Sequence, residues 1–87
     1  MKDYKAELQA LRPDDEIQQM ILTETGYNFI ITAGHGYLVI PREDKRHLQA
    51  IAICSYGYIG KDAVYLEEDC EAGEFLAGRE RIPSNIM

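Results

Sequence analysis

The sequence predicts a small α+β protein in which an antiparallel sheet of three to four strands packs against two to three short helices. Two observations support this prediction. Short runs rich in β-branched and aromatic residues follow one another before Pro41, with turn residues between them. After Pro41 the apolar residues take on the spacing of a helix. With 87 residues, the chain is expected to form a single domain over residues 1–87.

The strands before Pro41 are expected to form a meander, because short turns join each run to the next. Between the second and third runs, His35 stands between two glycines, and glycine tolerates the backbone angles of a tight turn. Pro41 ends the third run because it has no N–H to give to a sheet. The expected strands cover residues 17–24, 28–33, 36–40 and 63–66.

Residues 3–11 are expected to form a helix in an N-terminal segment that covers 1–12. Their residues Tyr4, Leu8 and Leu11 have the spacing of one apolar helical stripe. The helix should end where the chain approaches its first proline, because the residue before a proline is biased away from helical geometry.

Two further helices are expected after Pro41. In residues 42–53, Leu48 and Ile51 share one helical face, although a strand stays open as the alternative. Residues 67–77 are expected to be helical because acids in a first turn complement the helix dipole. Residues 79–87 are expected to be a loose tail.

The core is expected to be modest, because a chain of this length buries only about 60–65% of its surface. A stability on the order of 5 kcal/mol is expected for such a domain. The residues expected to form most of the core are Ile21, Phe29, Ile31, Leu38, Ile40, Leu48, Ile51, Leu66, Cys70 and Phe75.

The chain is acidic, with a net charge of −6 and a pI of about 4.7. Direct nucleic-acid binding is not expected, because it needs a clustered basic face. No apolar run reaches the length of about 18 residues that suggests a membrane span, and the N-terminus lacks the apolar stretch of a signal peptide. Cys54 and Cys70 fit a reducing compartment as well as one disulfide, and a cytoplasmic location is expected.

The most unusual segment is residues 67–74, which hold five carboxylates and neither Lys nor Arg. A block of like charge repels itself, so it needs either solvent or a positive partner. A solvated helix face and a surface that docks onto a basic groove are both open. Tyr56 and Tyr58 flank a glycine and are either interface anchors or half-buried packing residues. The residues expected to contact a partner are Asp62, Glu67, Glu68, Asp69, Glu71, Glu74, Tyr56 and Tyr58.

The sequence carries no recognisable catalytic signature. His35 is either a turn histidine bonded to a nearby group or a base or ligand. A nucleophile–base pair with Cys70 is disfavoured, because the carboxylates around that cysteine oppose thiolate formation. His35, His47, Cys54 and Cys70 lack the paired spacing of a zinc site. No metal and no cofactor is expected.

The pair His35-Gly36 at a strand turn, followed some thirty residues later by Leu66-Glu67-Glu68-Asp69-Cys70, resembles a family of small domains from phage, plasmid and other mobile-element proteins. The family pattern is a His-Gly-Gly turn, a strand and a helix, then an aromatic residue before Glu-Glu-Asp-Cys. The resemblance covers about residues 30–77. This chain differs in having Tyr37 in place of the second glycine and Leu66 in place of the aromatic. The resemblance implies an origin in a mobile element and no particular reaction.

The expected function is therefore binding and not catalysis. In a mobile element, the resemblance and the acidic charge together suggest an inhibitor of host defence of the anti-CRISPR or antirestriction kind, by analogy. The expected partner is a basic, nucleic-acid-handling host protein. Two alternatives stay open: a small enzyme that uses His35 and Cys70, and a structural homodimer that pairs through an exposed strand edge.

Overall fold

The structure is a computed structural model that describes residues 2–69 and 71–80. It contains a five-stranded sheet and three short helices, so the predicted α+β class is confirmed, with five strands where three to four were expected. In chain order the elements are α1 (Tyr4–Leu11), β1 (Ile17–Leu22), β2 (Asn28–Thr32), β3 (Gly36–Pro41), α2 (His47–Ile53), β4 (Tyr58–Ile59), β5 (Ala63–Glu67) and α3 (Glu71–Glu80).

The sheet has the order β1-β2-β3-β5-β4, and each neighbouring pair is antiparallel. The first three strands form the predicted meander. The added strand β4 has only two residues, which is too short to show a periodicity in the sequence. β5 enters between β3 and β4, so β3 and β5 form the middle of the sheet.

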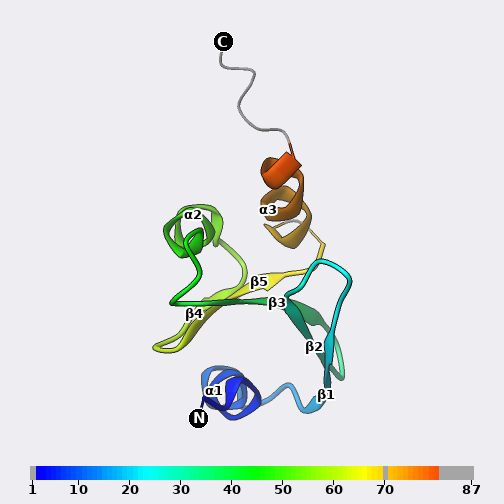
Figure 1. Ribbon diagram of the computed structural model, residues 1–87. Coiled ribbons are helices and arrows are strands. Elements are labelled where there is room, and N and C mark those ends of the chain that lie inside the picture. The colour runs from blue at the N-terminus through cyan, green and yellow to red at the C-terminus, as the bar shows by residue number, and fades with distance from the viewer. Residues whose placement is uncertain (1, 70, 81–87) are drawn as a thin grey trace.

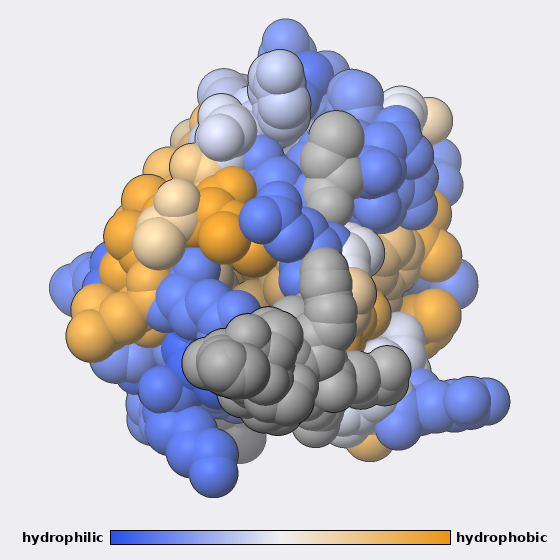
Figure 2. Space-filling model, turned by 90° about the horizontal axis from the view of Figure 1, so that it is seen from above, coloured by the Kyte–Doolittle hydropathy of each residue, from blue (hydrophilic) through white to orange (hydrophobic). Residues whose placement is uncertain are grey.

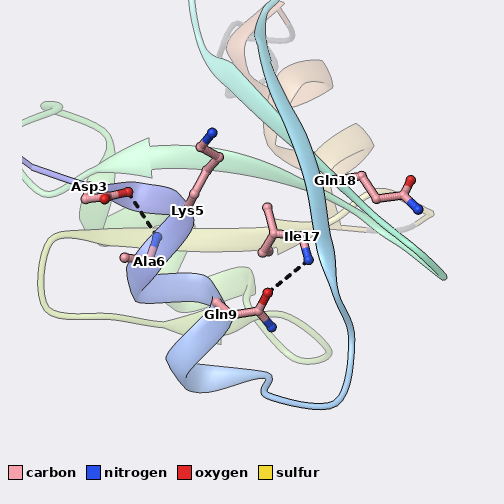
Figure 3. A pocket seen from close by; sticks show the side chains of 6 residues that line it. All are labelled: Asp3, Lys5, Ala6, Gln9, Ile17 and Gln18. Carbon is pink, nitrogen blue, oxygen red and sulfur yellow. Dashed lines mark hydrogen bonds between the residues drawn. The ribbon is translucent and has the colours of Figure 1, made fainter.

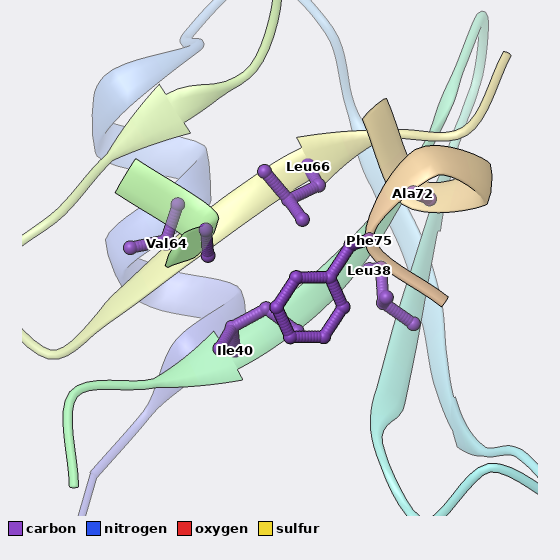
Figure 4. Close-up of a cluster of buried hydrophobic side chains, with 7 residues drawn as sticks. Leu38, Ile40, Val64, Leu66, Ala72 and Phe75 are labelled. Atoms are coloured by element: carbon purple, nitrogen blue, oxygen red, sulfur yellow. The ribbon is translucent and has the colours of Figure 1, made fainter. Parts of the chain in front are cut away.

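The molecule has three layers, with α1 on one face of the sheet and both α2 and α3 on the other (Figure 1). β3 and β5 read as nearly continuous apolar runs, which is typical of strands buried on both faces. Toward α2 and α3, the buried cluster contains Leu38, Ile40, Ala50, Val64, Leu66, Ala72 and Phe75 (Figure 4). Toward α1, it contains Leu8, Ile30, Tyr37, Val39, Ala63 and Tyr65.

Glu7 fastens α1 to the sheet. Its carboxylate accepts the hydroxyl of Tyr65 at 2.6 Å and the backbone N–H groups of Lys61 and Asp62 at 2.6 and 3.0 Å. Burial opposes ionisation of this carboxyl, but the bonds from Tyr65 and the backbone outweigh it and lower the pKa of Glu7. Burial and the bond to Glu7 raise the pKa of Tyr65.

Arg46 joins α2 to α3 on the opposite face. Its guanidinium lies 3.9 Å from the centre of the Phe75 ring, and its Nη2 donates to the carbonyl oxygen of Phe75 at 2.8 Å. The ring is fully buried, so this cation–π contact is made away from water.

Both later helices begin further along the chain than predicted. Residues 42–46 form turns before α2, where the N–H of Asp44 bonds the carbonyl of Pro41 and the N–H of His47 bonds that of Asp44. The predicted helix over residues 67–77 is wrong at its start, because Glu67 is the last residue of β5 and pairs with Tyr37. The acidic run is therefore divided among a strand end, a turn and a helix.

The predicted core is correct for Leu38, Ile40, Leu66 and Phe75, which are buried. It is wrong for Ile21 and Leu48, whose exposed fractions are 42% and 68%. Ile21 lies on β1 at the sheet edge, and Leu48 lies on the outer side of α2. The remaining predicted members are partly buried, namely Phe29, Ile31 and Ile51, and Cys70 lies outside the described residues.

The described part of the chain contains no helix that is both long and apolar enough to cross a membrane. Seen from the side of α2 and α3, the surface carries separate apolar areas among hydrophilic ones (Figure 2).

Candidate functional site

An open pocket lies where the turn after β2, the end of β5 and the loop between α2 and β4 come together. Its volume is about 390 Å³. Three aromatic rings, two carboxylates and one guanidinium line it, so its walls are both apolar and charged. The lining residues are Arg12, His35, Tyr37, Tyr56, Glu67 and Asp69.

A buried hydrogen-bond network positions His35. The carboxylate of Asp15 accepts the hydroxyl of Thr32 at 2.7 Å and the N–H of Gly34 at 3.2 Å. The Thr32 oxygen in turn accepts the N–H of His35 at 2.9 Å. The bond from Thr32, with help from Gly34, lowers the pKa of Asp15 despite its burial. Hydrogen bonds to the buried Asp15 and Thr32 therefore fix the turn that carries the imidazole, while His35 itself is exposed.

Arg12 forms one side of the pocket and was not predicted as a site residue. Its Nη1 donates to the hydroxyls of Tyr37 and Tyr58 at 3.3 and 3.2 Å, and its Nε donates to Asp14 at 3.2 Å. The bonds to Tyr58 and Asp14 raise the pKa of Arg12. The rings of Tyr37 and Tyr58 lie 5.9 Å apart. Tyr37 is buried, so it supports the guanidinium from inside the molecule.

Glu71 holds the loop that presents Tyr56. Its side chain is only 3% exposed. Oε2 accepts the N–H groups of Ser55, at 2.6 Å, and of Tyr56, while Oε1 accepts that of Gly57 at 3.0 Å. The same Oε1 accepts the N–H of Glu67 at 3.3 Å. Glu71 was expected to contact a partner, but its carboxylate is already used by the backbone and cannot do so. The loop leaves the Tyr56 ring 71% exposed.

The acidic residues on the pocket side are Glu67, Glu68 and Asp69. Glu67 is mostly covered, with a side chain 12% exposed, and its Oε2 lies 3.8 Å from Nδ1 of His35. Its Oε1 accepts the N–H of Asp69 at 3.0 Å, which fixes the turn after β5. Glu68 and Asp69 are exposed. We call Glu67, Glu68 and Asp69 the acidic edge.

The remaining predicted contact residues lie elsewhere. Asp62 precedes β5 and Glu67 ends it, so five extended residues place them roughly 17 Å apart along the strand direction. Glu74 is exposed on α3. Tyr58 is partly buried and bonds Arg12, so it supports the pocket instead of lining it. The structure therefore brings together Tyr56, Glu67 and Asp69 and separates them from Asp62.

The alternative catalytic pair cannot be placed, because Cys70 lies outside the described residues. Cys54, the other cysteine, is partly buried. Burial, with the nearby charge of Glu71, raises the pKa of its thiol, which opposes a nucleophilic role. Within residues 2–69 and 71–80, no group of His, Cys, Asp and Glu side chains is arranged to hold a metal ion.

A second hollow of about 310 Å³ lies between α1 and β1 (Figure 3). Two of its polar side chains, those of Asp3 and Gln9, bond the backbone. Asp3 caps α1 by accepting the N–H of Ala6 at 3.0 Å, and Gln9 accepts the N–H of Ile17 at 3.0 Å. These bonds join the helix to the first strand, which gives the hollow a structural role.

No protein-family model matches this chain, and comparisons with curated proteins and with solved structures found no match. The geometry of the pocket and of the acidic edge is therefore the basis for a functional proposal.

Proposed function

We propose that the protein acts by binding a basic protein through the acidic edge and the adjoining pocket, and that it is not an enzyme. One observation carries the proposal: three residues selected from the sequence as partner contacts line one open pocket, with Tyr56 in the loop before β4 and Glu67 and Asp69 at the end of β5 and in the turn after it. A largely exposed tyrosine beside carboxylates combines an interface anchor with charge that guides a partner into place.

The net charge of −6 supports the same function. A negative field attracts a basic surface over several ångströms and raises the rate of association. Proteins that handle nucleic acids present clustered Lys and Arg to phosphates, and surface carboxylates can compete for those groups. We therefore propose a nucleic-acid-handling host protein as the partner. The further step, to an inhibitor of host defence from a mobile element, depends on the motif resemblance alone.

The test compares two charge-matched variants. Glu68→Lys/Asp69→Lys reverses the acidic edge, and Glu43→Lys/Asp62→Lys reverses carboxylates near the other end of β5. Each reversal adds two charges, so both variants have a net charge of −2, from −6 + 4. The partner is first isolated by affinity capture on the unmodified protein, and binding of the purified partner is then measured by titration calorimetry.

The edge variant is expected to bind about tenfold more weakly or worse, because attraction becomes like-charge repulsion at the contact. The control variant should stay within about threefold, since its charges act only at long range and are screened by salt. Equal weakening of both variants, or full affinity of the edge variant, would contradict a local role for the acidic edge. Melting temperatures of both variants verify that they fold.

A homodimer is a second candidate, favoured by the exposed edge of β1. Ile21 and Leu22 are 42% and 70% exposed there, and an edge strand offers unpaired backbone groups to a second copy. Sedimentation equilibrium should then show a dimer that Leu22→Lys dissociates. A monomer at high micromolar concentration would exclude this candidate.

A further inference from the structure

We propose that the pocket receives one arginine side chain of the basic partner, stacked on Tyr56 and paired with the carboxylates of Asp69 and Glu67. This inference depends on the proposed function and names the group that the site recognises. The first argument is size. At about 390 Å³ the pocket is near the small end of ligand sites, which admits a single side chain and excludes a helix or strand.

The chemistry of the walls favours a guanidinium. Its planar face stacks on aromatic rings, and its N–H groups match carboxylate oxygens in pairs. Tyr56 supplies an exposed ring, and Asp69 supplies an exposed carboxylate whose side chain makes no hydrogen bond to any described residue. Glu67 also lines the pocket and adds a second carboxylate, whose side chain is 12% exposed.

The positive charge of Arg12 does not prevent the pocket from binding a guanidinium. Its charge is paired with Asp14, and the two carboxylates of the lining outnumber it. Of its five N–H donors, three are directed to Asp14, Tyr37 and Tyr58. The two on Nη2 bond to no residue in the described part of the chain. A backbone carbonyl of the partner next to the inserted arginine would provide the acceptor that these donors lack.

The pocket is formed before any ligand arrives. Glu71 holds the backbone on one side of it through residues 55–57, and Asp15 with Thr32 holds the His35 turn on the other. Glu67 fixes the backbone of Asp69. Such preorganisation lowers the entropy cost of ordering side chains on binding.

The test is an NMR titration of the full ¹⁵N-labelled chain with N-acetyl-arginine N-methylamide. We expect saturable amide shifts confined to residues 34–36, 56–57 and 67–69. Tyr56→Ala should weaken binding about two- to fivefold through loss of the cation–π contact. Asp69→Asn should weaken it by a similar factor. Asp62→Asn removes the same charge at the other end of β5 and should have no effect.

Two other probes define what would overturn the inference. The lysine analogue should bind more weakly, because an ammonium cannot form the planar fork. Inorganic phosphate should leave the pocket amides unshifted; if it shifts them and the arginine probe does not, the pocket is an anion site on Arg12 and the inference is wrong. Equal weakening by Asp69→Asn and Asp62→Asn would also refute it.

The variants distinguish failure of the arginine inference from failure of the proposed function. Tyr56→Ala keeps the net charge at −6, so a loss of partner binding in this variant reports on the pocket and not on the overall field. If the acidic-edge reversal abolishes partner binding while Tyr56→Ala and the arginine probe have no effect, the arginine inference fails and the proposed function stands. If the acidic-edge reversal also has no effect, both fail.

Discussion

Glu71 is expected to be the most sensitive polar residue of the fold. Its buried carboxylate accepts four backbone N–H groups, and Glu71→Ala would remove all four acceptor contacts at once. The donors belong to Ser55, Tyr56, Gly57 and Glu67. Leaving a buried donor without a partner costs about 1–3 kcal/mol, which gives an upper range of about 4–12 kcal/mol for four.

The actual loss should be smaller, because Ser55 and Tyr56 are exposed and water can reach their N–H groups in the variant. We expect the free energy of unfolding to fall by roughly 2–6 kcal/mol, because the less exposed N–H groups of Gly57 and Glu67 then lack an acceptor, at about 1–3 kcal/mol each. That is comparable to the whole stability, on the order of 5 kcal/mol, of a domain of this size. Glu71→Ala should therefore be close to unfolded at 25 °C.

Glu71→Gln gives a measurable intermediate. A carboxamide keeps one oxygen and so two of the four acceptor contacts, and we expect a loss of roughly 2 kcal/mol. The matched control is Glu74→Gln, an exposed carboxylate one turn later, whose effect should stay within about 0.5 kcal/mol. Urea unfolding followed by circular dichroism gives the three values, provided that the slope of free energy against urea is unchanged. A loss below about 1 kcal/mol in Glu71→Ala would refute the assigned role.

Three further predictions follow from packing and ionisation. Gly57→Ala should lower the free energy of unfolding by about 1–3 kcal/mol, because the added Cβ would lie 1.9 Å from the carbonyl oxygen of Tyr65. A urea midpoint equal to that of the wild type would contradict this prediction and show that the loop can shift to accept the methyl group. Phe75→Ala should lose roughly 3–5 kcal/mol in the same assay, while Leu48→Ala should lose almost nothing, and comparable losses would contradict the assigned core. The pKa of Glu7 is lowered from its usual 4.5, so its bonds stabilise the fold above about pH 5 and this contribution is lost as pH falls through the folded-state pKa. The pKa of Tyr65 is raised from 10.0, so the stability from its neutral form is lost as pH rises above about 10. Unfolding free energies measured from pH 3 to about 11 should decline at both ends, and Glu7→Gln should flatten the acid side.

The strands β1, β2 and β3 could be predicted because their signals are local. The runs that became β1, β2 and β3 are rich in strand-forming residues and are separated by turns, which needs no knowledge of distant contacts. The face of the sheet that each helix covers could not be predicted in this way. The stripe of Tyr4 and Leu8 indicated a helix, but nothing local showed that it would cover a second face of the sheet. The core prediction consequently missed Tyr37, Val39 and Tyr65 on that face.

Only part of the site could be predicted, because only part of it has a local signal in the sequence. Tyr56, Glu67 and Asp69 stood out by composition, whereas Arg12 appeared only as the end of a helix. Its partners Tyr37 and Tyr58 lie 25 and 46 residues away, and no short pattern connects them. Nothing in the sequence indicated that Glu71 would bond the backbone of a distant loop either. Within a run of carboxylates the sequence does not distinguish the one that turns inward to a loop 14 to 16 residues upstream.

Site-specific photo-cross-linking tests the central claim, that the acidic edge is the working surface, most directly. A benzophenone amino acid is placed at Glu68 on the acidic edge or at Glu43, an equally charged and exposed position near the other end of the central strands. Both variants lose one carboxylate, so their net charges are equal. After irradiation with the captured partner, we expect a covalent adduct with a basic protein from position 68 and none from position 43. Adducts of equal yield from both positions, or from position 43 alone, would contradict the claim.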